Sequence, residues 1–293
     1  MAVLLLSLSG PLQSWGLTSR FSRRDTQPMP TKSAVIGLLA SAQGRVREDS
    51  VEDLAGLRFA VRADQPGVIL RDYQTEHALD WQQRAKSIKM PVTERFYLSD
   101  AAFLVALAAQ GETGLELLKG LSHAVKQPVW PLYLGRRSCP PSPPVRTKLL
   151  ESESDPLDVL RHEPWIASDW YQRRHRAQIA EGTLRLDISA DAPWDDAAAP
   201  RQTGRDQVAE SIDMDTPISF SLRHRQYAVR RVIHTSVAVA DLDARQNTDS
   251  QGSKDSPSSR YSHSLSSASE TRAASATQRA CPAFDGDHDP LQF

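Results

Sequence analysis

The sequence predicts an α+β fold built on the split β-α-β plan of ferredoxin-like and RRM-like domains. The chain has 293 residues, of which 40% are hydrophobic, enough to bury the core of one or two domains. Short apolar runs alternate with two segments whose apolar residues recur at helical spacing. In order, we expect strands at 2–8, 57–63, 68–73, 96–109 and 129–134, with helices starting near residue 31 and spanning 112–125.

The first strand is the apolar run from Ala2 to Leu8. It is too short to span a bilayer, has no basic leader and ends at Gly10-Pro11, so it indicates a buried strand and not a signal peptide. We therefore expect a cytoplasmic protein with no membrane contact.

The two helices follow from capping signals and from one apolar face each. Thr31 is a good N-cap placed after Pro30, and Gly44 is a stop signal. The apolar positions are Val35, Leu38, Leu39 and Ala42 in the first helix, and Leu115, Leu118, Leu121 and Val125 in the second.

Between the helices, Asp64-Gln65-Pro66-Gly67 is a turn signal that predicts a hairpin of strands 57–63 and 68–73. The segment from 74 to 95 is polar and basic and reads as an insertion. The run 96–109 recovers strand character, and 129–134 is the expected final strand of the plan.

Beyond residue 139 the composition changes twice. Prolines cluster at 140–144, and a short helix at 155–162 with strands at 184–189, 218–222 and 227–234 predicts a small, mostly β lobe. Residues 244–279 contain 11 serines and almost no large apolar side chain, so we expect disorder there. The predicted divisions are therefore 1–139, 140–240 and a tail at 241–293.

Charge is distributed unevenly although the net charge is only −1. Residues 1–150 carry 19 Lys and Arg against 13 Asp and Glu, whereas residues 151–293 carry 16 against 23. A basic N-terminal half favours a polyanionic partner, and ordinary solvated surface is the alternative. The two cysteines, Cys139 and Cys281, do not have metal-ligand spacing, so we expect no metal and no cofactor.

Residues 31–33 form a candidate phosphate seat. Thr31, Lys32 and Ser33 place backbone N–H groups, hydroxyls and an ammonium at the positive end of a helix. The Walker A frame is missing, and plain helix capping is an equally good interpretation.

Cations also cluster beside aromatic side chains. Arg20, Arg23, Arg24 and Lys32 lie near Trp15 and Phe21, a pattern typical of proteins that bind single-stranded RNA. Trp15 is as well explained by core packing as by base stacking.

A glycine turn downstream carries further polar groups suited to phosphate and base edges. It runs Tyr133-Leu134-Gly135-Arg136-Arg137-Ser138-Cys139-Pro140 and offers backbone N–H groups, a hydroxyl and two guanidinium groups. Arg71 and Tyr73 end a predicted strand, and Arg84, Lys86 and Lys89 lie in the 74–95 insertion. A solvated charged face is the alternative for these insertion residues.

No catalytic residues are predicted. The eight histidines are scattered, and no carboxylate cluster suits two-metal chemistry.

Four blocks in fixed order, GPLQSWG at 10–16, PTKSAVIGLL at 30–39, LRDYQTE at 70–76 and the glycine turn at 133–140, resemble the CasD family of the RAMP superfamily. The resemblance implies a subunit of the type I-E CRISPR complex Cascade that binds the 5′ handle of crRNA. It implies that the 74–95 insertion is a thumb contacting RNA or the backbone subunit CasC, that another surface meets the large subunit CasA, and that target DNA is touched only indirectly. The expected RNA contacts are Gln13, Trp15, Arg20, Arg23, Arg24, Thr31, Lys32, Ser33, Arg71, Tyr73, Tyr133, Gly135, Arg136, Arg137 and Ser138, with Arg84, Lys86 and Lys89 on the thumb.

Two alternatives stay open at this point. One is a metal-independent endoribonuclease that processes CRISPR repeat RNA on the same scaffold. The other is an RRM-like RNA-binding protein that acts outside any complex.

Overall fold

The computed structural model describes residues 1–17, 19, 22–75, 92–151, 155–193 and 209–242, and the backbone of 77–79 and 87–89. The chain divides into two units, Met1–Ser253 and Lys254–Phe293, and all the described residues belong to the first. Arg20, Phe21, Arg84 and Lys86, the side chain of Lys89 and the serine-rich tail lie outside them.

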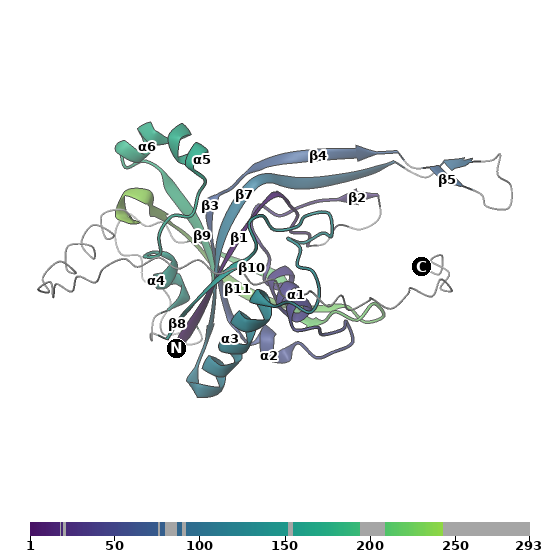
Figure 1. Cartoon of the computed structure of the whole chain (residues 1–293), viewed down its shortest axis with the longest axis horizontal. Helices are drawn as coiled ribbons and strands as arrows, with labels where there is room; N and C mark the ends of the chain where they lie inside the picture. The colour runs from purple at the N-terminus through teal and green to yellow at the C-terminus, as the bar shows by residue number, and fades with distance from the viewer. Residues whose placement is uncertain are drawn as a thin grey trace, which may run out of the picture. The chain divides into compact units, whose positions relative to one another are not determined.

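A nine-stranded sheet organises the first unit (Figure 1). Its main path has the order β10-β11-β9-β3-β7-β1-β8, and β2 and β4 also pair with β7. A separate hairpin joins β5 and β6. The strands are β1 (Ala2–Gln13), β2 (Arg23–Arg24), β3 (Arg58–Gln65), β4 (Val68–Gln74), β5 (His77–Leu79), β6 (Ser87–Lys89), β7 (Thr93–Ala109), β8 (Arg146–Leu150), β9 (Arg185–Asp191), β10 (Ala209–Ser219) and β11 (Gln226–Ala238).

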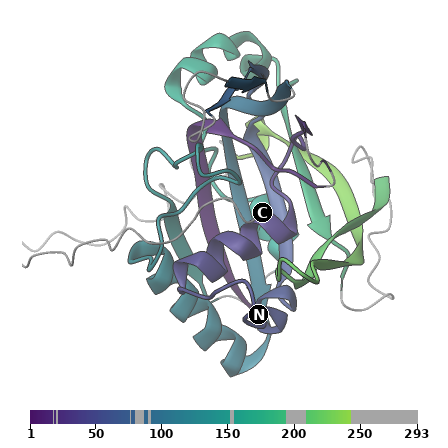
Figure 2. The ribbon, with the colours of Figure 1, turned by 90° about the vertical axis from the view of Figure 1, so that its right-hand side faces the viewer.

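Helices pack on both faces of the sheet, and β1 shows why. Successive side chains of a strand point to opposite faces. Leu4 and Leu6 therefore pack with the core under α1 and α3, whereas Val3 and Leu5 pack with the core that includes α4. Figure 2 shows α1 crossing in front of the strands. The helices are α1 (Lys32–Ala42), α2 (Glu52–Ala55), α3 (Gly111–Lys126), α4 (Pro156–Leu160), α5 (Asp169–Arg174) and α6 (Arg176–Ala180).

The two helices predicted near residue 31 and at 112–125 are both confirmed. Thr31 caps α1 by accepting a hydrogen bond from the Ala34 N–H, 3.3 Å away. Helix α3 spans the expected segment and buries Leu118, Leu121 and Val125.

The predicted hairpin at 57–73 is wrong, because β3 and β4 do not pair with each other. Both pair with β7, β3 along residues 102–108 and β4 along residues 93–99. Gly67 lies at the bend between them with φ +75°, and a Cβ there would stand 2.5 Å from the Ser99 carbonyl oxygen. The turn signal thus marks the bend between β3 and β4, which pair with successive parts of the long strand β7.

Two other strand assignments are corrected. Residues 129–134 form no strand, and the place beside β1 is taken by β8, which follows the proline cluster. The strand expected at 218–222 is the end of β10, which stops at Ser219. Strands β9 to β11 extend the same sheet through β3, so the C-terminal β-rich region shares the N-terminal sheet. The division near residue 139 stays a prediction.

Candidate RNA interface

Three segments that are distant in sequence meet along residues 94–97 of β7. On one side, β2 pairs Arg23 with Glu94 and Arg24 with Arg95. On the other side, β4 pairs Arg71 with Phe96. The third segment is the glycine turn, whose Arg136 donates to the Phe96 carbonyl oxygen. We call Arg23, Arg24, Arg71, Arg136 and Arg137 the arginine shelf.

Aromatic rings of this region support two exposed guanidinium groups. Arg23 lies 5.0 Å from the centroid of the Phe96 ring, and Arg71 lies 5.8 Å from that of Tyr73. The side chain of Arg23 is 66% exposed, and that of Arg71 is 56% exposed. A guanidinium held over a ring keeps donors directed to solvent, where phosphate oxygens can bind them.

Acidic neighbours moderate the positive charge. Arg23 pairs with Asp25 at 3.0 Å, and Arg71 pairs with Glu94. Exposed ion pairs of this kind are weak, so a polyanion can displace them at little cost.

Arg136 joins the glycine turn to β7 and β2. Its guanidinium donates to the carbonyl oxygens of Phe96 at 3.2 Å and Arg24 at 2.9 Å, and it lies 4.7 Å from the centroid of the Tyr97 ring. Because these donors are used internally, Arg136 positions the loop, whereas the neighbouring Arg137 and Ser138 are exposed.

The glycine turn fits closely against the end of β1. Gly135 has φ +91°, and a Cβ at this position would lie 1.7 Å from the Ser14 carbonyl oxygen. The Ser14 N–H also donates to the Leu134 carbonyl oxygen at 3.0 Å. Only glycine permits both the backbone conformation and this approach.

Gln13 and Trp15 lie beneath this region and are fully buried. The Trp15 indole N–H donates to Gln13 Oε1 at 3.1 Å, and the Gln13 amide donates to the Ala101 carbonyl oxygen at 2.7 Å. Of the two interpretations of Trp15, core packing is therefore the one observed. Tyr73 is exposed, and Tyr133 is half-buried.

The predicted phosphate seat at α1 is already occupied by a carboxylate. The Lys32 N–H donates to Asp215 Oδ2 at 2.7 Å, and Lys32 Nζ pairs with Asp191 at 2.9 Å. Thr31, Lys32 and Ser33 are all buried. These three residues, which the sequence predicted as RNA contacts, therefore do not belong to the arginine shelf.

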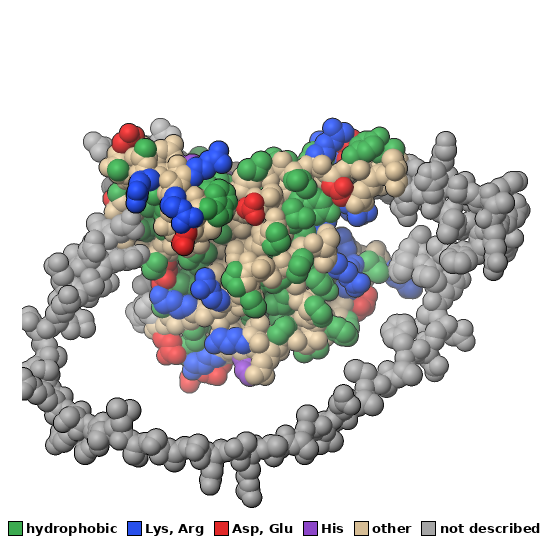
Figure 3. Space-filling model, turned by 45° about the horizontal axis from the view of Figure 1, so that its top comes forward, with side chains coloured by type: hydrophobic (Ala, Val, Ile, Leu, Met, Phe, Trp, Pro, Cys, Tyr) green, Lys and Arg blue, Asp and Glu red, His purple; other side chains and the backbone are tan. Residues whose placement is uncertain are grey.

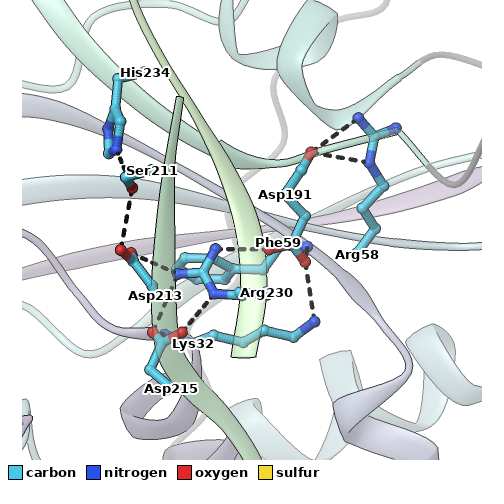
Figure 4. Close-up of polar contacts among 9 residues, drawn as sticks. All are labelled: Lys32, Arg58, Phe59, Asp191, Ser211, Asp213, Asp215, Arg230 and His234. Atoms are coloured by element: carbon cyan, nitrogen blue, oxygen red, sulfur yellow. Dashed lines mark hydrogen bonds and ion pairs between the residues drawn. The ribbon is translucent and has the colours of Figure 1, made fainter. Parts of the chain in front are cut away.

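Arg230 completes this arrangement, which we call the Lys32 cluster: Lys32, Asp191, Asp215 and Arg230 (Figure 4). Arg230 pairs with Asp191 at 2.6 Å and with Asp215, and it lies over the Phe59 ring. Desolvation acts to lower the pKa of the Arg230 guanidinium, but its bonds and charge pairing with Asp215 and Asp191 outweigh this and raise the pKa. Arg230 therefore stays charged.

Sequence reasoning missed Phe96, the ring under Arg23, and the carboxylate partners Asp191 and Asp215. An aromatic pair at 96–97 directly after the basic insertion was an available signal for Phe96. Within the described residues there is no group of three or more His, Cys, Asp or Glu able to hold a metal ion. Nor does the described part of the chain include a helix with the length and apolarity to cross a membrane.

Side chains of two kinds gather over the base of the thumb. Figure 3 shows Lys and Arg side chains next to hydrophobic ones there, at the upper right. The exposed apolar residues of β4 are Val68, Ile69, Leu70 and Tyr73.

Comparison with known proteins shows which family the chain belongs to. Residues 3–233 match the model of the family described as CRISPR-associated protein (Cas_Cas5). The Cascade subunit CasD of Escherichia coli K12 is 34% identical over 180 residues, which cover 57% of this chain and 80% of that protein.

Two solved structures are also similar. One, described as the crystal structure of a Cas protein, has 34% identity and a TM-score of 0.54, over 82% of this chain and 97% of that one. The other, from a CRISPR RNA-guided surveillance complex, has 29% identity and a TM-score of 0.58, over 84% and 98%. The chain therefore belongs to the CasD family of Cas5-type CRISPR-associated proteins.

Proposed function

We propose that this chain is a non-catalytic subunit of Cascade that clamps the 5′ handle of crRNA and nucleates one end of the complex. The observation that carries the proposal is the arginine shelf, where exposed cations from separate segments lie along one stretch of β7. The similar proteins include a Cascade subunit and a chain of an RNA-guided surveillance complex.

The chemistry of the shelf suits a single RNA strand. Guanidinium groups of Arg23, Arg24 and Arg137 would bind phosphates, and the exposed ring of Tyr73 would stack on a base. Arg136 and Gly135 would hold the loop in place, and buried Gln13 and Trp15 would support it from below.

Protein partners would bind around this RNA site. The exposed apolar side chains of β4 suit a protein contact at the thumb, which we assign to CasC. We place CasA on another surface, and target DNA would meet this chain only through the assembled complex.

The direct test measures affinity for a synthetic 5′ handle RNA over a range of salt concentrations. The variant Arg23→Gln/Arg24→Gln removes two exposed cations of the shelf. The slope of log K against log[salt] is negative, and each lost phosphate contact should make it shallower by about 0.7, the value for single strands. A matched control, Arg47→Gln/Arg173→Gln, removes two exposed cations from other parts of the chain and should leave the slope unchanged.

An unchanged slope in the shelf variant would refute the proposed interface. Intact handle RNA after incubation without metal would agree with a non-catalytic role, and cleavage would favour the endoribonuclease alternative. If the tagged chain retrieves guide RNA but neither CasC nor CasA, this result would favour a stand-alone RNA-binding protein.

A further inference from the structure

Exposed arginines also gather on α5 and α6, in a part of the chain that contributes nothing to the arginine shelf. Arg173, Arg174 and Arg176 are all exposed, although residues 151–293 as a whole carry 16 Lys and Arg against 23 Asp and Glu. Figure 3 shows Lys and Arg side chains on the lobe at the upper left, where Figure 1 labels α5 and α6. This basic surface therefore stands out in the acidic half of the sequence.

A row of aromatic rings fixes α5 on the end of β3. The Trp165 indole N–H donates to the Asp64 carbonyl oxygen at 2.8 Å. The Tyr171 ring lies 6.2 Å from that of Trp165 and 5.7 Å from that of Trp170, and it lies 4.3 Å from the His175 ring, all between centroids. Trp170 is the exposed member of the row, with 45% of its surface accessible. Its ring is therefore both held in place and open to a ligand.

Arg174 lies on the same side of α5 as these rings. Successive helical residues are about 100° apart, which puts Arg174 near Tyr171 around the helix axis and Arg173 on the opposite side. Burial raises the pKa of the Tyr171 hydroxyl, and the nearby charge of Arg174 opposes this effect. We call Trp170, Arg174, His175 and Arg176 the α5–α6 patch.

The two arginines of the patch have donors to spare. Within the described residues, the side chains of Arg174 and Arg176 form no ion pair and no hydrogen bond. Exposed arginines of the shelf differ, since Arg23 and Arg71 each pair with a carboxylate. Neighbouring like charges repel each other, and an anion that binds between them relieves the repulsion.

We propose that the α5–α6 patch binds a single strand of nucleic acid outside the handle. Guanidinium groups bind phosphate oxygens, and an exposed ring stacks on a base of any identity. A protein partner is less well served, because Trp170 is the one large exposed hydrophobic residue of α5 and α6 and interfaces need an apolar centre. This site does not rest on the proposed handle function, because none of its residues belongs to the arginine shelf.

The test is an NMR titration of the isotope-labelled full chain that carries Arg23→Gln/Arg24→Gln, so that the shelf does not compete. The chain has six tryptophans, and the indole N–H signal of Trp170 is identified by its loss in Trp170→Phe. The probes are an oligouridylate and an oligothymidylate of about ten nucleotides, within the usual site size for single strands, and an oligoglutamate of equal length.

We expect the nucleic-acid probes to shift the Trp170 indole signal in a saturable way that weakens with salt. Tighter binding of uridylate would identify the strand as RNA, and tighter binding of thymidylate would identify it as DNA; either result supports the proposal. No shift from both strands would overturn it. An equal shift from oligoglutamate would also overturn it, because the patch would then be a surface for an acidic protein segment.

Charge variants test the arginines. Arg174→Gln/Arg176→Gln should make the negative slope of log K against log[salt] shallower by about 0.7 for each lost phosphate contact. The matched control Arg47→Gln/Arg225→Gln removes two exposed cations elsewhere and should leave the slope unchanged. Equal slopes in the two double variants would contradict the proposal.

A ring variant tests stacking. Trp170→Leu, followed at the amide signals of residues 173–176, should weaken strand binding about fivefold or more. Trp130→Leu is the matched control, since Trp130 is similarly exposed at 52% but lies outside the patch, and it should bind as the parent chain does. Unchanged affinity in a folded Trp170→Leu would remove the ring from the site. If this variant does not fold, the arginine variant decides the question, because it alters only exposed side chains.

Discussion

The arginine shelf and the Lys32 cluster both contain basic side chains, but Arg23 of the shelf is exposed, whereas the cations of the cluster are buried and paired. The shelf presents Arg23 with 66% of its side chain exposed and only weak ion pairs. In the cluster, the side chains of Lys32 and Arg230 are 7% and 9% exposed. Asp191 of β9 binds both side chains, and Asp215 of β10 binds the Arg230 side chain and the Lys32 backbone N–H. The difference teaches that a cation's availability is decided by its tertiary partners, because both kinds look alike in the sequence.

Breaking the buried cluster should give the largest loss of stability. Asp191 accepts hydrogen bonds from Lys32 Nζ, from Arg230 and from the Phe59 N–H. Asp191→Ala leaves two buried cations without that carboxylate, so the free energy of unfolding in urea should fall by about 3–5 kcal/mol. The control Asp187→Ala, at an exposed position of the same strand, should change it by about 0.5 kcal/mol or less. Equal losses in the two variants would show that the cluster is not a structural centre.

Gly135→Ala tests the contact that brings the glycine turn to β1. The new Cβ would meet the Ser14 carbonyl oxygen and would force a left-handed backbone on alanine. We expect about 2–3 kcal/mol of destabilisation together with weaker handle RNA binding. Gly182→Ala is a matched control, since Gly182 has φ +65° but no atom within 4 Å of the added Cβ, and it should cost only about 1 kcal/mol. If the two variants are equally stable and bind RNA equally, the close approach at Ser14 has no role.

An exposed ion pair should show the smallest effect and sharpen the contrast with the cluster. Arg45 and Asp53 form a bidentate pair in which Asp53 is 43% exposed, and the hydrogen bond from Arg45 lowers the pKa of Asp53. A lowered carboxyl pKa contributes stability above the unfolded pKa, and this contribution is lost as the pH falls through the folded pKa. Asp53→Asn should therefore cost less than about 1 kcal/mol at neutral pH, and the difference from wild type should vanish once the pH falls below the lowered folded pKa. A difference that persists in acid would point to a cause other than charge.

Local signals in the sequence determined the helices, and distant partners determined the sites. Thr31 caps α1 as its type and position predict, because capping depends on residues within one turn. The role of Lys32 depends on Asp191, 159 residues away, and no local pattern signals such a partner. Pro66-Gly67 predicted a hairpin because a turn signal does not report that β7 is long enough to pair with both flanking strands.

The cations of the arginine shelf are visible in the sequence, but their meeting place is not. They lie in three separate blocks, and only the structure shows that β2, β4 and residue 136 all meet β7 at 94–97. Trp15 was ambiguous in the sequence because a tryptophan serves equally as a core anchor or a stacking ring, and only the packing shows that it is buried.

The most direct test of the account is a crosslinking map between this chain and a handle RNA that carries photoreactive uridines. We predict crosslinks at residues 22–24, 71–73 and 136–138 and none at Lys32 or Arg230, which are paired inside the fold. Crosslinks concentrated on Lys32 or Arg230, with the shelf unmarked, would contradict the assignment of the exposed arginines to RNA.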